Sequence, residues 1–200
     1  MKRGLHLRIG LCLLFLLGSA VPGWSGEPTD KIKQTTDKII SIVKNPALKG
    51  PAKAEEKRKM IRQAVDERFD WEEMAQRALA RHWSQRTPEE KKEFVRLFGD
   101  LLERTYLNKV EGYSGEKVQY EGESVDGDYS AVKVKIVTDK NVDIPVEYRL
   151  RKINANWLVY DISIEGVSLV NNYRSQFNTI ISQSSFGNLV KKLKEKGASN

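Results

Sequence analysis

Residues 144–166 have the sequence IPVEYRLRKINANWLVYDISIEG, and they decide the fold because apolar and polar side chains alternate along them. A period of two is typical of β-strands that bury one face, and Asn154-Ala155-Asn156 is typical of a turn. The stretch therefore predicts an antiparallel hairpin. The side chains expected on its apolar face are Ile144, Val146, Tyr148 and Leu150 before the turn, and Leu158, Tyr160, Ile162 and Ile164 after it.

The same period extends toward the N-terminus. Val132, Val134 and Ile136 alternate with lysines, and residues 139–141 form a turn before the hairpin. A weaker strand is expected around residues 118–120. Together these segments predict an antiparallel sheet of about four strands with one apolar and one charged face.

Helical spacing surrounds the sheet on both sides in sequence. Helices are expected over residues 31–43, 52–68 and from Asp70 onward, and Thr87-Pro88-Glu89-Glu90 combines the N-cap, N1 proline and N3 glutamate of a helix start. That helix is expected to run to about Val110, and helical spacing resumes after Gly166. The fold class predicted is α+β, with the helix from Pro88 and the helix after Gly166 covering the apolar face of a curved sheet.

The N-terminal residues predict export. Three basic residues precede the apolar run 9–17, and small residues follow it, which is typical of a secretory signal peptide. Cleavage could follow Ala20 or Ser25. We expect residues 1–25 to be the signal and residues 26–200 to form a single domain in the periplasm, without a permanent membrane anchor.

Removing the signal takes away three basic residues and no acidic one, so the net charge falls from +7 to about +4. A modest positive excess suits anionic lipid head groups or an acidic partner, although it could merely aid solubility. Export argues against nucleic acid as a partner.

The residues available for catalysis are few. The chain has one cysteine, Cys12, inside the expected signal, and His82 would be the one histidine of the mature chain. A cysteine nucleophile and a histidine–cysteine metal cluster are therefore excluded, and no cofactor is expected. His82 lies beside Trp83 at an expected helix end, where a structural role is the simpler interpretation. The sequence favours a protein that is not an enzyme.

The apolar interior has two interpretations, an ordinary close-packed core and a ligand cavity. A curved sheet under long helices can enclose a pocket, and tyrosines suit its mouth because a hydroxyl can stay hydrated beside an apolar ring. The candidate pocket residues are Leu97, Phe98, Leu101, Tyr106, Val134, Ile136, Ile144, Val146, Tyr148, Leu150, Ile162, Ile164, Leu169, Tyr173 and Phe177.

Two long segments resemble one known family. Residues 144–181, IPVEYRLRKINANWLVYDISIEGVSLVNNYRSQFNTII, closely resemble the MlaC family, the toluene-tolerance auxiliary component of an ABC transporter. Residues 69–106, FDWEEMAQRALARHWSQRTPEEKKEFVRLFGDLLERTY, are similar to that family's Phe-Asp, Met-Ala, Trp and Thr-Pro-Glu landmarks in order, and residues 113–118, YSGEKV, also fit. The resemblance covers nearly all of the expected mature chain.

The resemblance implies a function as a carrier. It implies a periplasmic protein of MlaC-like or NTF2-like fold that holds phospholipid acyl chains between sheet and helices. Such a protein shuttles lipid between an outer-membrane lipoprotein complex and an inner-membrane ABC transporter with a substrate-binding hexamer. A hopanoid-type lipid is an alternative cargo, and a ligand-free interaction module or a hydrolase using His82 is an alternative function.

The resemblance also suggests roles for individual residues. Tyr106, Tyr148 and Tyr173 become candidates for the pocket wall. Arg174 becomes a candidate for orienting Asp161 or Glu165 in a structural ion pair, or for meeting a phosphate at the pocket mouth. A structural pair is favoured because a buried cation needs a carboxylate nearby.

Overall fold

The computed structural model describes residues 26–198, with side chains described as far as residue 195. The expected signal peptide at residues 1–25 lies outside the described residues. The elements, in order, are α1 (Glu27–Lys44), η1 (Pro46–Leu48), η2 (Pro51–Lys53), α2 (Ala54–Asp66), α3 (Trp71–Leu79), η3 (Ala80–Gln85), α4 (Pro88–Glu111), β1 (Lys117–Asp126), β2 (Tyr129–Val137), β3 (Asp143–Ile153), β4 (Asn156–Ile164), β5 (Val167–Ser168), α5 (Leu169–Gln183) and α6 (Phe186–Ala198).

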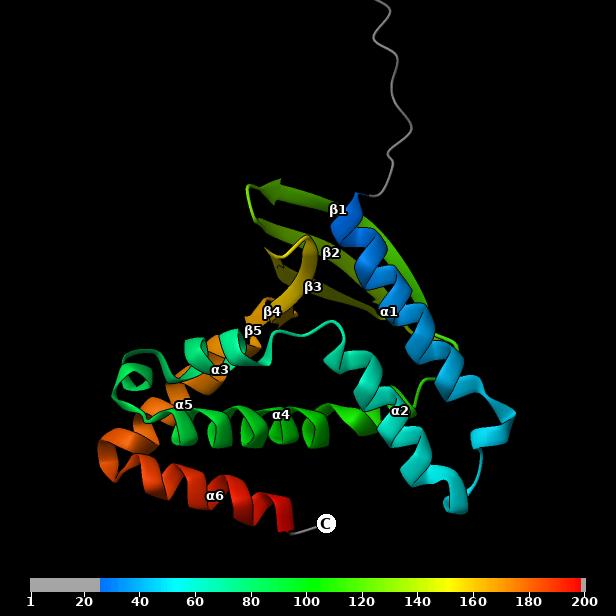
Figure 1. The fold of residues 1–200 in the computed structure, drawn as a ribbon. Coiled ribbons are helices and arrows are strands. Elements are labelled where there is room, and N and C mark those ends of the chain that lie inside the picture. The colour runs from blue at the N-terminus through cyan, green and yellow to red at the C-terminus, as the bar shows by residue number, and fades with distance from the viewer. Residues whose placement is uncertain (1–25, 199–200) are drawn as a thin grey trace, which may run out of the picture.

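The strands form one antiparallel meander in the order β1-β2-β3-β4-β5. The expected α+β class is confirmed, and the sheet contains the four expected strands plus the two-residue strand β5. Val134 pairs with Val146, and Val146 pairs with Ile164, so the alternation expected from the sequence places these side chains on one face. Figure 1 shows the sheet above the long helix α4, with α1 running along it.

The helix that contacts the most strands of the sheet is α1. It contacts β1, β2 and β4, and its buried Ile32 joins the core formed by Val132, Leu150 and Trp157. The sequence suggested α4 and α5 as the helices that cover the sheet. The expectation is confirmed for α5 at one end of the sheet, where it contacts β4 and β5, whereas α4 stands farther from the sheet (Figure 1). Helical periodicity identifies an apolar face but does not say which neighbour it meets, so this assignment could not be made from the sequence.

A β-bulge divides β4 into two parts. The pairing with β3 shifts between Arg149 and Leu150, so Tyr148 pairs with Ile162 whereas Leu150 pairs with Val159. The prediction that Leu158 and Tyr160 share a face with Ile162 and Ile164 was wrong for this reason. In the first half of β4, the buried side chains are those of Trp157 and Val159. A bulge changes which residue faces the core, and alternation alone does not reveal it.

The four helices α3, α4, α5 and α6 build a second core, with α3 and α6 on opposite sides of α4 (Figure 1). Its centre is aromatic, with Phe94, Phe98 and Phe177 in mutual contact and Phe186 from α6 against Phe94. The start of α4 is fixed as expected, because the Thr87 side chain accepts a hydrogen bond from Glu90 N and the Glu90 carboxylate accepts one from Thr87 N. Such a capping box satisfies backbone donors at both residues.

The linker between α2 and α3 is fastened to the sheet. Phe69 forms a parallel bridge with Val159: Asp70 N donates to Val159 O at 2.8 Å, and Val159 N donates to Arg68 O at 2.8 Å. Asp70 is also the N-cap of α3, at the position where the sequence predicts that a helix begins. Its other carboxylate oxygen accepts hydrogen bonds from Arg151 of β3, with Nε and Nη2 both at 2.6 Å. This linker therefore ties the helical core to the sheet.

Candidate functional site

An apolar cavity of about 250 Å³ lies between the sheet and the helices α1, α2 and α4. Its volume is near the lower end of the range for small-molecule pockets, ~300–1,000 Å³. The cavity occupies the space left because α1 packs on one part of the sheet while α4 stands away from it. Its lining residues are Ile32, Thr35, Thr36, Ile39, Ile61, Arg62, Val65, Arg68, Phe69, Trp71, Met74, Leu102, Glu103, Tyr106, Leu107, Val110, Ile136, Val146, Tyr148, Ile162, Ile164 and Leu169.

Part of the set expected from the sequence lines this cavity. These residues come from the sheet, the C-terminal half of α4 and the start of α5, and the β4 bulge leaves the two isoleucines of β4 facing inward. Their contact with a lipid stays a prediction. The residues are Tyr106, Ile136, Val146, Tyr148, Ile162, Ile164 and Leu169.

The rest of that set lies outside the cavity wall. One group belongs to the helical core: Leu97, Phe98, Leu101 and Phe177 are buried there, with Tyr173 packed against them. The other group belongs to the sheet core: Val134 and Leu150 are buried there, with Ile144 packed against them. The apolar stripe of α4 therefore contributes to the helical core in its N-terminal half and lines the cavity in its C-terminal half. The periodicity of the sequence does not show where one half ends and the other begins.

Sequence reasoning missed the wall formed by α1, α2 and the linker after α2. Ile32 and Ile39 of α1, and Ile61 and Val65 of α2, do stand at helical spacing in the sequence. This spacing indicates that both helices are amphipathic, but it does not indicate which elements their apolar faces contact. Phe69 and Trp71, which stack at 5.2 Å between ring centroids, complete this part of the wall.

Arg62 is the centre of a charged cluster at one side of the cavity. Its guanidinium donates to Asp66 Oδ1 at 2.8 Å and to Glu103, and it lies 5.4 Å from the centre of the Trp71 ring. Asp100 contributes a third carboxylate at 3.4 Å. Burial opposes the charge on Arg62, but the hydrogen bonds to Asp66 and Glu103 outweigh it and raise the pKa of the guanidinium. The cluster joins α2 to α4 where the cavity wall meets solvent.

Arg68 is a second cation on the wall, with neutral partners. Nε donates to Thr35 Oγ1 at 3.1 Å and Nη1 donates to Trp157 O at 2.7 Å. Burial lowers its pKa, an effect that the nearby charge of Glu67 partly offsets. These bonds tie α1, the linker after α2 and β4 together beside the cavity.

Tyrosine hydroxyls supply most of the remaining polar groups. Burial raises the pKa of Tyr148 to about 12, with a further contribution from Tyr120. Tyr148 is nevertheless only half-buried by exposed area. Because Tyr148 lines the cavity, we assign that exposed surface to the cavity and not to bulk water. Burial, and then Tyr173, raises the pKa of Tyr106.

The three residues proposed for an ion pair or a pocket mouth are not brought together. Asp161 is buried and accepts hydrogen bonds from Ser168 Oγ at 2.6 Å and Val170 N at 3.1 Å, which caps the start of α5. Its nearest cation is Arg149, at 3.6 Å. Arg174 Nε instead donates to Arg77 O at 2.8 Å, and Glu165 is exposed in the turn between β4 and β5. A structural ion pair of Arg174 with Asp161 is therefore absent from the described residues.

His82 lies away from the cavity wall, in η3, with Nε2 3.1 Å from Asn178 Oδ1. Among residues 26–195, no group of three or more histidine, cysteine, aspartate or glutamate side chains has the arrangement of a metal site. No helix in the part of the chain that the structure describes is long and apolar enough to cross a membrane.

A five-stranded antiparallel sheet, helices packed against it and an apolar cavity between them define the class as α+β proteins with an internal apolar cavity. The family model described as MlaC protein matches residues 33–195, and the chain therefore belongs to the MlaC family. The resemblance seen in the sequence is confirmed.

Individual relatives agree with this family. The intermembrane phospholipid transport system binding protein MlaC of Haemophilus influenzae is 23% identical over 169 residues, which cover 82% of this chain and 79% of that protein. The toluene tolerance protein ttg2D of Pseudomonas putida is 26% identical over 92 residues, 46% of this chain and 43% of that protein. The structure of the phospholipid-binding protein of Ralstonia solanacearum, solved in complex with a phospholipid, matches with a TM-score of 0.78 and 28% identity, covering 86% of this chain and 98% of that one.

Proposed function

We propose that this protein is a periplasmic carrier that shelters the acyl chains of a phospholipid in the cavity under the sheet. The observation that supports it most directly is an apolar cavity between the sheet and the helices α1, α2 and α4 in a chain of the MlaC family. The Ralstonia relative, of the same fold, was solved with a phospholipid. Export by a cleavable signal at residues 1–25 is part of the proposal.

The binding energy would come from apolar burial. Each methylene removed from water contributes about 0.8 kcal/mol, so even part of one acyl chain in the cavity gives substantial affinity. The same binding energy opposes release of the lipid into water. Release then requires a membrane partner with an equally apolar path, and the proposed partners are an outer-membrane lipoprotein complex and an inner-membrane ABC transporter.

The carrier needs no catalytic step. His82 is engaged with Asn178 outside the cavity wall, so His82→Ala should leave lipid uptake unchanged. A loss of uptake in this variant would instead favour a role for His82 in the function.

The direct test is native mass spectrometry of the mature protein purified without detergent, followed by lipid extraction. A stoichiometric adduct with the mass of a phospholipid supports the proposal, and a hopanoid mass would change the cargo. A protein that carries no lipid and takes none up from added vesicles would be an interaction module instead.

A matched pair of variants links uptake to the cavity. Ile162→Trp would fill space in the cavity, because Ile162 lies on its wall. Leu158→Trp adds the same bulk on the same strand beyond the bulge, outside the cavity wall. We expect lipid uptake to fall at least several-fold for Ile162→Trp alone, with both variants folded by circular dichroism. Equal uptake in the two variants would place the lipid elsewhere.

A further inference from the structure

Hydroxyl groups without an acceptor lie in the cavity wall, at Thr36 and Tyr148, and beside it, at Tyr120. Tyr120 of β1 has a buried hydroxyl without a hydrogen-bond partner among the described residues. Thr36 of α1 lies near it, without the geometry of a hydrogen bond, and lines the cavity. Buried polar groups are nearly always hydrogen-bonded, and a buried hydroxyl left without a partner destabilises the folded protein.

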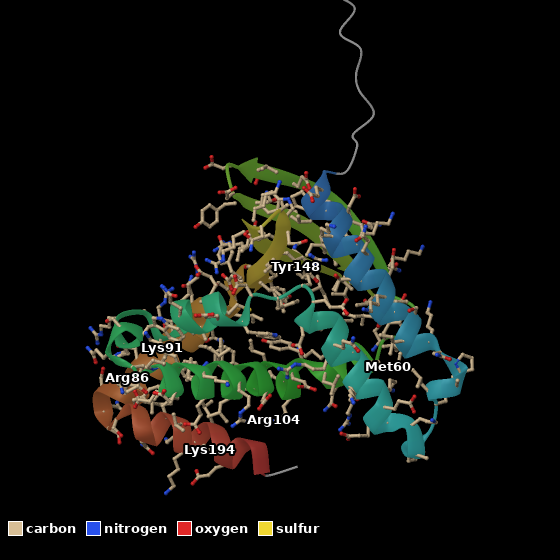
Figure 2. The ribbon with its side chains drawn as sticks, viewed as in Figure 1. Met60, Arg86, Lys91, Arg104, Tyr148 and Lys194 are labelled. Atoms are coloured by element: carbon tan, nitrogen blue, oxygen red, sulfur yellow. The ribbon has the colours of Figure 1, made fainter. Side chains whose placement is uncertain are left out.

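Tyr148 belongs to the same group of hydroxyls. In the sheet, Tyr120 pairs with Val134, and Val134 pairs with Val146, two residues before Tyr148. The two tyrosines thus lie on the same face, on strands separated by β2. The Tyr148 hydroxyl forms no hydrogen bond with any residue that the structure describes, and Figure 2 shows Tyr148 beneath the sheet, on the side of α4.

The surroundings of these hydroxyls favour an uncharged acceptor. Burial, and after it the charge of Asp37, raises the pKa of the Tyr120 hydroxyl, so a further negative charge is disfavoured at this position. The cation of the wall in this region, Arg68, is bound to Thr35 and Trp157 O. A buried anion without a paired cation is costly, whereas a neutral carbonyl oxygen is not. The hydroxyls therefore suit a neutral acceptor better than a phosphate.

We propose that Tyr148, with Tyr120 and Thr36, forms a subsite that donates hydrogen bonds to an ester carbonyl of a diacyl lipid. This inference rests on the proposed function and makes it more specific: the cavity selects ester-linked lipids over ether-linked lipids and over apolar lipids that lack an acceptor at this depth. The acyl chains supply affinity, and the hydroxyls fix how deep the ester groups enter.

The test compares two lipids that differ only in this linkage. The mature protein is incubated with vesicles that contain equal amounts of dipalmitoyl phosphatidylcholine and its dihexadecyl ether analogue, and the bound lipids are extracted and quantified by mass spectrometry. We expect the wild type to hold about five to ten times more ester than ether lipid, the effect of a hydrogen bond to a buried hydroxyl. Tyr148→Phe should bring the ratio close to one.

The ratio is measured within one sample, so a partly unfolded variant still reports it. Tyr160→Phe is the matched control, because this ring lies under Arg77 outside the cavity wall, and it should keep the wild-type ratio. An equal ratio in the wild type, or a Tyr148→Phe variant that keeps the wild-type preference, would overturn the subsite. Failure of the wild type to take up either lipid would contradict the carrier function itself.

Discussion

Asp161 is a buried carboxylate whose partners are a hydroxyl and a backbone amide at the start of α5. The sequence made Asp161 a candidate because it lies near the end of the last expected strand. The partner could not be predicted, since the bulge in β4 decides which way the side chain points. The structure makes Asp161 a structural cap for α5 and leaves its neighbour Glu165 exposed to solvent.

The contrast between these two carboxylates can be measured. Asp161→Ala leaves Ser168 and Val170 N without their acceptor, so we expect the free energy of unfolding to fall by about 2–3 kcal/mol. Glu165→Ala removes an exposed side chain and should change it by less than about 0.5 kcal/mol. Urea denaturation followed by circular dichroism gives both values. Similar losses in the two variants would show that Asp161 is not a structural cap.

Tyr148 makes stability sensitive to alkaline pH. Its pKa is about 12 in the folded protein, against 10.0 as the ordinary value, because burial disfavours the tyrosinate. As pH rises above that ordinary value, the unfolded chain loses this proton while the folded protein keeps it, which favours unfolding. The stabilising contribution is complete below pH 10.0 and is lost as pH rises through about 12.

The measurement is the free energy of unfolding of the wild type and of Tyr148→Phe across this range. Other groups titrate in both proteins, so the difference isolates Tyr148. We expect the wild type to lose stability relative to the variant as pH rises through this window. Two parallel pH profiles would mean that Tyr148 titrates like an exposed tyrosine.

At the scale of the elements, the sequence predicted the features that depend on local residues better than those that depend on packing between elements. The sequence predicted the start of α4 at Thr87, the helix start at Asp70 and the meander. Each of these features depends on residues that are close together in the chain. The bulge between Arg149 and Leu150 was not predicted, and neither was the packing of α1 on the sheet. Those features depend on contacts between distant segments, which a single sequence does not encode visibly.

The attachment of α2 to α4 depends on the Arg62 cluster. Arg62 lies between Trp71 and the backbone of α4 at Gly99, where an added Cβ would lie 3.1 Å from Arg62 Nη2. Removing the side chain in Arg62→Ala leaves three carboxylates near one another without their shared cation. Since the Arg62 side chain is 25% exposed, we expect a loss of about 1–2 kcal/mol in the free energy of unfolding.

Arg96→Ala provides the comparison. Arg96 also pairs with Asp100, but its side chain is 61% exposed, so its loss should cost less than about 0.5 kcal/mol. Thermal and urea unfolding of the two variants distinguish them. If Arg96→Ala were as destabilising as Arg62→Ala, the stability would come from the shared carboxylate and not from the position of Arg62 between α2 and α4.

At the scale of the whole molecule, the two apolar regions differ in how they are packed. The aromatic core of α3 to α6 is closely packed, whereas the region between the sheet and the helices α1, α2 and α4 contains the cavity. The candidate pocket residues expected from the sequence were drawn from both regions, because both are equally apolar in sequence. Only the three-dimensional structure distinguishes the residues that fill the aromatic core from those that line the cavity.

Lipid binding should therefore protect the two regions unequally. We expect amide hydrogen exchange in α1 and α2 to slow when lipid occupies the cavity, since residues of both helices line it. Exchange in α6 should not change, because none of the lining residues lies on that helix. Mass spectrometry of the lipid-loaded and lipid-free protein measures this. Protection concentrated in α6 would place the ligand outside the cavity.

The bridge between Phe69 and Val159 has a consequence for association between copies of the protein. An open strand edge is a template on which further copies of a protein can polymerise. In the first half of β4, this edge is occupied by the linker after α2, and at the other end β5 pairs with it. At the opposite border of the sheet, β1 is interrupted by a bulge at Gly122 and carries Glu121 and Glu123. Both borders of the sheet are thus protected against edge-to-edge association with further copies of the protein.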